Sequence, residues 1–296
     1  MNKIIFYTLL LFIIRYFYNK YNLHLVNNDY DSKVKLINNH IIYSNKPNIW
    51  ILVPNDVNSR KWYSFGSRTS KKLNVPFVNI CIDSIIKHCG NDFTINIIKD
   101  SSFNEFIPDW KYTVKNAPEV EKIKLRKLGL LKLIYYYGGL IVPCSFYCEK
   151  NLIDIYDDSI SFENTNNSLN NVKNLFLPTI DFIGAKKNNK FIEKLINNYE
   201  LEENKITNKI GNLIKKNTTV IDGKFIGVKT KQNKTVFIDD LFNGTELVDY
   251  GERFGVLIPL NDIINKSKYA WFSRMNSLQI KNSNLFISKI LSNNII

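Results

Sequence analysis

Two kinds of hydrophobic pattern alternate along the first half of the chain. Short apolar runs beside turn residues predict buried strands, at residues 49–53, 94–98 and 140–142. Between them, residues 75–88 and 119–137 carry apolar side chains three and four positions apart, which predicts helices. Strand, helix, strand, helix and strand in this order indicate βαβ units and therefore a parallel sheet.

Glycines mark the ends of both predicted helices. Gly90 follows the first helix, and Gly138 and Gly139 follow the second. Because glycine tolerates the left-handed backbone that ends many helices, we expect these residues to act as C-caps.

The second half of the chain is less regular, and its pattern predicts shorter elements. Short strands are predicted at residues 159–163, 176–177, 182–185, 236–238 and 256–260. Helices are predicted at residues 189–199 and 202–216, and an Asn-rich surface loop at residues 164–174. We therefore expect an α/β fold with a mainly parallel sheet flanked by helices.

A hydrophobic segment opens the chain. Residues 4–14 are apolar except for Tyr7 and Thr8, and Arg15 separates them from the aromatic residues 16–18. The stretch of about 15 residues is shorter than the ~20 that span a bilayer as a helix, so a short signal anchor, a cleaved signal peptide and an amphipathic surface segment all remain open. We favour a membrane anchor, because no small-residue cleavage site follows the run.

This segment sets the expected domain organisation. Residues 1–18 are predicted to be a hydrophobic membrane anchor, residues 19–47 a polar stem or linker, and residues 48–296 the α/β domain. The protein is therefore expected at a membrane, as a single-pass or peripheral protein. Basic residues flank the run on both sides, so its orientation stays undecided.

A strong positive charge could indicate a nucleic-acid partner. The net charge is +13 and the sequence pI is about 9.4. However, Lys, Asn and Ile are all abundant, which indicates a compositional bias, and no homeodomain, zinc-finger or RNA-recognition signature is present. We therefore expect no nucleic-acid partner, and a nucleic-acid-associated basic protein is the weaker alternative.

The spacing of the four cysteines excludes one disulfide and disfavours a zinc site. Cys81 and Cys89 fall on one predicted helix, where a rise of about 1.5 Å per residue puts their Cα atoms roughly 12 Å apart, too far for a disulfide. Cys144 and Cys148 have no histidine or Cys-x-x-Cys partner, so a zinc site is not expected.

Residues 125–145 carry a family resemblance. They read LRKLGLLKLIYYYGGLIVPCS, which resembles the helix, Gly-Gly turn and strand of glycosyltransferases related to fungal initiating α-1,6-mannosyltransferases and bacterial capsular-polysaccharide synthesis proteins. Residues 178–186 and the helix predicted after them resemble a later strand-and-helix segment of that family, so the resemblance covers residues 47–199. It implies a GT-A fold and an enzyme that transfers a sugar from a nucleoside diphosphate donor to a glycan or protein acceptor.

The metal-binding residues of that family are missing from this chain. Counted from Gly139, the family's two metal-site aspartates fall on Pro143 and Ser145, and its helix aspartate falls on Lys127. In the family, the acidic pair holds a divalent cation that bridges the donor's diphosphate and stabilises the leaving group. Proline offers no side-chain ligand and a lone serine binds Mg²⁺ or Mn²⁺ poorly, so no metal cofactor is expected and transfer would be metal-independent.

Cations could replace the metal at the donor's diphosphate. Five of them follow the first predicted strand, namely Arg60, Lys61, Arg68, Lys71 and Lys72, and Arg60, Arg68, Lys71 and Lys72 are the donor-binding candidates. Ligands of open α/β sheets bind at the carboxyl ends of strands, so these cations could neutralise a diphosphate, although a solvated basic loop is the alternative. The other donor-binding candidates are Asp100 after the second strand, Arg126 on the long helix, and Pro143 and Ser145, which the resemblance aligns with the metal site.

Acidic and aromatic residues of the second half are candidates for the acceptor side. Asp181 lies where such enzymes often carry an acidic residue near the acceptor, so it could orient or deprotonate an acceptor hydroxyl, and a turn cap is the alternative. Trp271 and Arg274 could stack on a sugar or base and bind phosphate, unless Trp271 belongs to the core. Asp239 and Asp240 could supply carboxylates, although paired aspartates more often cap turns or helices.

Two functions therefore compete. The first is a membrane-anchored, metal-independent glycosyltransferase in which Asp181 takes part in catalysis. The second is a catalytically inactive relative that keeps the fold and binds a glycan, a nucleotide or a protein partner.

Overall fold

The computed structural model of the protein describes residues 46–54, 75–165, 176–201, 207–243 and 248–292. The chain divides into two units, Met1–Ser44 and Asn45–Ile296, and all described residues belong to the second. Outside the described residues lie the predicted anchor, nearly all of the predicted stem, and the basic residues Arg60, Arg68, Lys71 and Lys72. Within the part of the chain that the structure describes, no helix has both the length and the apolar character needed to cross a membrane.

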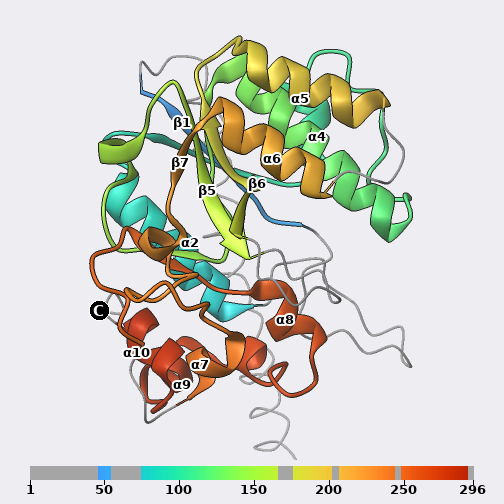
Figure 1. Ribbon diagram of the computed structural model, residues 1–296. Helices are drawn as coiled ribbons and strands as arrows, with labels where there is room; N and C mark the ends of the chain where they lie inside the picture. The colour runs from blue at the N-terminus through green and yellow to red at the C-terminus, as the bar shows by residue number, and fades with distance from the viewer. Residues whose placement is uncertain (1–45, 55–74, 166–175, 202–206, 244–247, 293–296) are drawn as a thin grey trace, which may run out of the picture. The chain divides into compact units, whose positions relative to one another are not determined.

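A mixed sheet of six strands forms the centre of the described fold, in the order β2-β1-β3-β6-β5-β7 (Figure 1). The strands are β1 Asn48–Leu52, β2 Thr94–Ile98, β3 Gly139–Ile141, β5 Ser159–Thr165, β6 Phe176–Ala185 and β7 Thr219–Ile221. β1 pairs in parallel with β2 and β3, and β5 pairs in parallel with β7, whereas β6 runs antiparallel to both β3 and β5. The fold is therefore α/β, as predicted, but its sheet is mixed rather than mainly parallel.

The connection between β5 and β6 explains why the sheet is mixed. Only residues 166–175 join these two strands, fewer than the dozen or so residues that a parallel crossover requires. β5 and β6 must therefore run in opposite directions, and β6 alone is reversed, because β5 and β7 run in the same direction as β3.

Helices connect the strands and cover the sheet. α2 (Pro76–Cys89) lies between β1 and β2 in the chain, and α4 (Glu119–Tyr137) lies between β2 and β3. α5 (Lys190–Leu201) and α6 (Thr207–Asn217) follow β6; α5 packs on α4, and α6 packs on β6 (Figure 1). α4 packs on β1, β3 and β6, whereas α2 packs on a strand of a second, smaller sheet.

Both long helices of the first half follow the prediction. α4 has the predicted bounds, and its apolar face is buried, with no more than 4% exposure for Leu125, Leu128, Leu131 and Ile134. Gly90 ends α2 as predicted, although with a right-handed backbone (φ −64°), so this end does not use the left-handed freedom of glycine.

The second sheet has two antiparallel strands, β4 (Phe146–Cys148) and β8 (Gly255–Leu257). Strand β4 packs on α2, so this small sheet connects the C-terminal part of the chain to the first half. The short helices that complete the described fold are α3 Ser102–Phe106, η1 Leu152–Ile155, η2 Gly223–Ile226, α7 Ile238–Phe242, α8 Leu260–Asn265, η3 Phe272–Arg274, α9 Ser277–Lys281 and α10 Phe286–Ser292.

Two strand predictions of the second half need a correction in extent. Residues 176–177 and 182–185 belong to one continuous strand, β6, whose backbone stays extended across a bulge against β5. The strand predicted at residues 256–260 ends at Leu257 in β8, and Leu260 begins α8.

The strand predicted at residues 236–238 is wrong. Ile238 instead begins α7, and the Asp240 carboxylate accepts a hydrogen bond from the Phe237 N–H at 2.7 Å. An apolar stretch of three residues is too short for its periodicity to distinguish a strand from a helix. Asp240 thus serves as a helix cap, the alternative role considered for it.

The turn at Gly138 and Gly139 joins α4 to β3, and its backbone lies very close to the backbone of β1. Gly138 has a φ of 70° and ends α4, with its N–H donating to the Ile134 carbonyl at 2.7 Å. Gly139 has a φ of 113°, and a Cβ at this position would lie 2.2 Å from the Asn48 carbonyl oxygen. The Trp50 indole N–H donates to the Gly138 carbonyl at 2.9 Å, which ties the turn to β1.

Replacing Gly139 with alanine tests this close approach. The new Cβ would meet the Asn48 carbonyl oxygen at 2.2 Å with a φ of 113°, so we expect Gly139→Ala to lower the free energy of unfolding by roughly 3 kcal/mol or more. Urea unfolding followed by circular dichroism measures the change. Gly251→Ala is the matched control, because Gly251 also has a positive φ (66°) but its nearest neighbouring atom would be 3.6 Å away, and we expect it to cost about 1 kcal/mol. Equal costs for the two variants would contradict the close approach.

Candidate functional site

The strand order creates a crevice at the carboxyl ends of β1 and β3. β2 and β3 lie on opposite sides of β1, so the chain first moves to one side of β1 and then crosses to the other. In open α/β sheets, ligands bind at this kind of switch point. Leu52 at the end of β1 and Pro54 after it, together with Val142 and Pro143 after β3, line a pocket of about 810 Å³ there. A volume of this size is typical of small-molecule sites.

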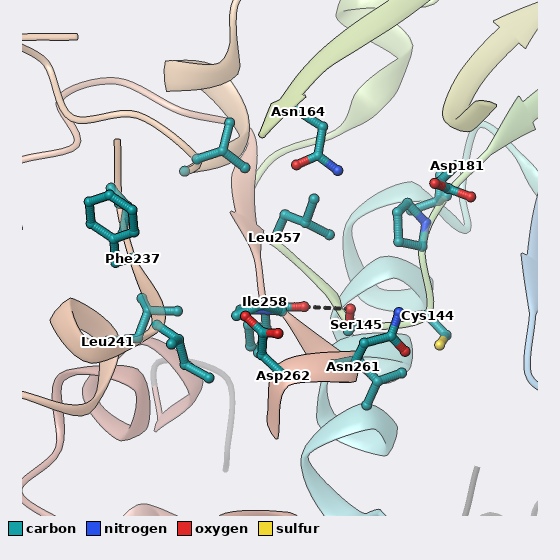
Figure 2. A pocket seen from close by; sticks show the side chains of 18 of the residues that line it. Cys144, Ser145, Asn164, Asp181, Phe237, Leu241, Leu257, Ile258, Asn261 and Asp262 are labelled. Atoms are coloured by element: carbon teal, nitrogen blue, oxygen red, sulfur yellow. Dashed lines mark hydrogen bonds between the residues drawn. The ribbon is translucent and has the colours of Figure 1, made fainter. Parts of the chain in front are cut away.

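Segments from the whole second half of the described chain form the other walls of this pocket. They are β5 with Asn164, β6 with Asp181, the stretch from Gly227 to α7, and the stretch from Leu257 to Lys266. Figure 2 shows Asn164 and Asp181 at one end of the pocket, and Asn261 and Asp262 at the other. Amides and carboxylates thus converge on a space that is otherwise mainly apolar.

The residues after β3 reach the pocket and are held there by a long-range contact. Ser145 is buried, and its hydroxyl donates to the Ile258 carbonyl at 2.7 Å (Figure 2). Cys144 lies between Pro143 and Ser145 in the sequence, and its thiol is also buried. The loss of solvent raises the pKa of Cys144 to about 12. This position therefore presents a proline, a neutral thiol and a hydroxyl whose proton is already donated.

These side chains do not fit a divalent cation. Pro143 has no ligand atom, and the Ser145 hydroxyl is directed at a carbonyl oxygen. Elsewhere among the described residues, no group of three or more His, Cys, Asp or Glu side chains is arranged to hold a metal ion.

Asp181 lines the pocket from β6 and is paired with a lysine of α4. Its Oδ2 lies 3.4 Å from the Nζ of Lys127, and the Asp181 side chain is 48% exposed. The charge of Asp181 is the main cause of a raised pKa for Lys127, so the lysine stays protonated. The Asp181 carboxylate is thereby both oriented by a cation and open to the pocket.

The described lining of the pocket is acidic. It contains the carboxylates of Asp181, Asp239 and Asp262, and the one cation among its described residues is Lys266, whose Nζ lies 3.2 Å from Asp262 Oδ2. Asp239 pairs with Lys268 and accepts a hydrogen bond from the Tyr269 hydroxyl at 2.6 Å, and these bonds lower its pKa. Each of the three carboxylates is paired with a lysine, so the lining has no excess of cations for a phosphate, whereas its carboxylate oxygens can accept hydrogen bonds from a hydroxyl-rich ligand.

An exposed aromatic ring lies at this pocket. Phe237 is one of its lining residues, and 53% of Phe237 is exposed. Its backbone N–H donates to the Asp240 carboxylate, which fixes the backbone at the start of α7. An aromatic face near carboxylates and amides can pack against the apolar face of a sugar ring.

Two donor-binding candidates pair with each other outside the pocket lining. Arg126 on α4 binds Asp100 through two hydrogen bonds of 2.8 Å, Nε to Oδ1 and Nη2 to Oδ2, and each side chain is 12% exposed. This bidentate pair joins the end of β2 to α4. Neither residue is among those that line the pocket, and their role toward a donor stays a prediction.

Trp271 and Arg274 also lie apart from the pocket lining. Trp271 is 44% exposed, its indole N–H donates to the Lys268 carbonyl at 2.9 Å, and its ring contacts that of Phe242. It is therefore a half-exposed ring packed beside α7 rather than a core residue.

The sequence pattern missed several residues that the pocket brings together. Asn164, Phe237, Asn261 and Asp262 line the pocket, but none belongs to a recognisable motif. Asn164 opens an Asn-rich stretch, Phe237 precedes α7, and Asn261 and Asp262 lie in α8, and no periodicity predicted these two short helices. Their common position depends on the pairing of β4 with β8, which joins distant parts of the chain.

Comparison with known proteins adds no relative. No protein-family model matches the chain, and no curated protein and no solved structure matches it. The fold and the site therefore define the class only as an α/β protein with an acidic, partly aromatic pocket at the switch point of a mixed sheet.

The pair of Arg126 and Asp100 can be tested by breaking and removing it. Arg126→Gln and Asp100→Asn should each lower the free energy of unfolding by about 2 kcal/mol, because a mostly buried charge loses its bidentate partner. The double variant should cost clearly less than the sum of the two, as measured by urea unfolding. Additive losses would mean that the two residues act independently.

Proposed function

We propose that the protein is a GT-A-like glycosyltransferase that transfers a sugar from a nucleoside diphosphate donor to a glycan or protein acceptor without a divalent metal. We further propose that residues 1–18 hold it at a membrane. The proposal for the enzyme rests on the residues after the Gly138-Gly139 turn, which line the pocket at the sheet's switch point. In the family that residues 125–145 resemble, the same turn leads to the donor site.

Asp181 is the proposed base. Its carboxylate faces the pocket and lies 3.4 Å from Lys127, which orients it. As the acceptor hydroxyl oxygen attacks the anomeric carbon of the donor sugar, its proton passes to Asp181. The bond between that carbon and the diphosphate breaks, and the nucleoside diphosphate leaves.

The diphosphate needs positive charge, which the described lining does not supply in excess. Its carboxylates Asp181, Asp239 and Asp262 outnumber Lys266. The basic residues Arg60, Arg68, Lys71 and Lys72 belong to the segment that follows Pro54, itself a lining residue. We therefore assign the diphosphate to that segment and the sugar to the acidic lining.

Donor turnover by the full chain in detergent tests this function. With a panel of UDP- and GDP-sugars, we expect donor hydrolysis or transfer that is unchanged by EDTA and by added Mn²⁺. Asp181→Asn should lower kcat by about 10²-fold or more with little change in donor affinity. Asp154→Asn is the control, because Asp154 is exposed and outside the pocket lining. Loss of turnover in EDTA would contradict the metal-independent mechanism, and full activity of Asp181→Asn would contradict the role of Asp181.

A second function, a non-catalytic glycan-binding relative, is favoured by the acidic lining and by Phe237. Carboxylates, amides and an exposed ring can bind a neutral sugar without any diphosphate chemistry. Glycan binding with no donor turnover would select this function over the first.

Phe237→Ala tests the aromatic contact that both functions would share. We expect it to weaken glycan binding by about 1 kcal/mol, or roughly fivefold, because a stacked ring is lost. Calorimetry against the glycans selected from a panel measures the change. Leu278→Ala is the matched control, since Leu278 is 69% exposed and does not line the pocket. Unchanged affinity of Phe237→Ala would remove Phe237 from the binding surface.

A further inference from the structure

Two cysteines that are far apart in the sequence meet in the interior. Cys89 is the last residue of α2, Cys148 is the last residue of β4, and their Sγ atoms lie 3.8 Å apart with neither residue exposed. We propose that Cys89 and Cys148 are a disulfide site, which closes when the chain folds under oxidising conditions. The pairing considered from the sequence, Cys81 with Cys89, is not the one that the fold brings together.

The backbone around the two thiols is already fixed by hydrogen bonds between α2 and β4. The N–H of Cys148 donates to the Ser84 hydroxyl at 2.8 Å, and that hydroxyl donates to the Cys81 carbonyl at 2.6 Å. The position of β4 against α2 therefore brings the two sulfur atoms together. A disulfide has a sulfur–sulfur distance of about 2.05 Å, so closing it requires an approach of roughly 2 Å at the ends of two elements.

The contact also makes the two thiols unequal. The hydrogen bond with Cys148 lowers the pKa of Cys89, and the same bond raises the pKa of Cys148. The Lys150 carbonyl, 3.0 Å from the Cys148 sulfur, is a second acceptor for the one proton of that thiol. Cys89 is therefore the thiolate that attacks an oxidant, and Cys148 is the resolving thiol.

The reaction is a thiol–disulfide exchange with a small disulfide such as oxidised glutathione. The Cys89 thiolate attacks one glutathione sulfur, the glutathione disulfide bond breaks, and the released glutathione thiolate takes up a proton. Cys148 then loses its proton and attacks the Cys89 sulfur of the mixed disulfide, which releases the second glutathione. Two protein thiols are oxidised to one disulfide, and one oxidised glutathione is reduced to two thiols.

The other two cysteines are poor competitors. Burial raises the pKa of Cys81 well above its ordinary value, and it raises the pKa of Cys144 to about 12. Both therefore stay protonated and unreactive. Because Cys89 and Cys148 are also buried once the chain has folded, the bond should form late in folding, when α2 has docked on β4 but the pair is still open to the oxidant.

Refolding in a redox buffer tests the site. The full chain is unfolded, reduced, and refolded in detergent with a mixture of reduced and oxidised glutathione, and free thiols are then alkylated in denaturant. Of the four cysteines, we expect two to be alkylated, and proteolytic mapping by mass spectrometry should join the Cys89 peptide to the Cys148 peptide. The oxidised protein should also unfold at a higher urea concentration than the reduced protein.

Two variants separate this pair from the alternatives. The double variant Cys81→Ala with Cys144→Ala should keep the cross-link, whereas Cys89→Ser should lose it. The peptide map of the unmodified chain needs no variant, so a folding defect in either variant leaves the test intact. Four free thiols after refolding, or a cross-link that joins any other pair, would overturn the proposal.

Discussion

The close approach of Gly139 to β1 is the constraint on which the rest of the described fold depends. The Asn48 carbonyl occupies the space that a side chain at position 139 would need, and the Trp50 indole holds the carbonyl of Gly138. Because α4 and β3 are fixed against β1 in this way, the chain after β3 must enter the crevice at the sheet's switch point. A local backbone requirement thus determines that the residues after β3 line this pocket.

The opposite wall reaches the same crevice through contacts between distant parts of the chain. β4 pairs with β8, and the hydroxyl of Ser145 binds the carbonyl of Ile258 across 113 positions. These contacts put Asn261 and Asp262 opposite Asn164 and Asp181 (Figure 2). The same strand, β4, brings its last residue against α2, so the proposed disulfide would hold the small sheet that carries one side of the pocket.

The described lining of this pocket differs in charge from the protein as a whole. The whole protein has a net charge of +13, yet the described lining carries more carboxylates than cations. Hydroxyl groups of a sugar match such a surface, and a diphosphate does not. The proposed division of a nucleotide-sugar donor between this lining and the basic segment after Pro54 rests on this difference.

The first half of the fold could be predicted from the amino-acid sequence: the strands near 49–53, 94–98 and 140–142, the two helices between them, and a turn that requires glycine. The two helices are long and clearly periodic, and turn residues or glycines beside the short apolar runs identify the strands. The sequence also pointed to Pro143, Ser145, Asp181 and Asp239, which line one pocket. The folded chain was needed to show the reversed direction of β6, the partner of Cys89, and the pairing of Arg126 with Asp100 away from that pocket. Each of these depends on residues meeting across tens of positions, which no local pattern records.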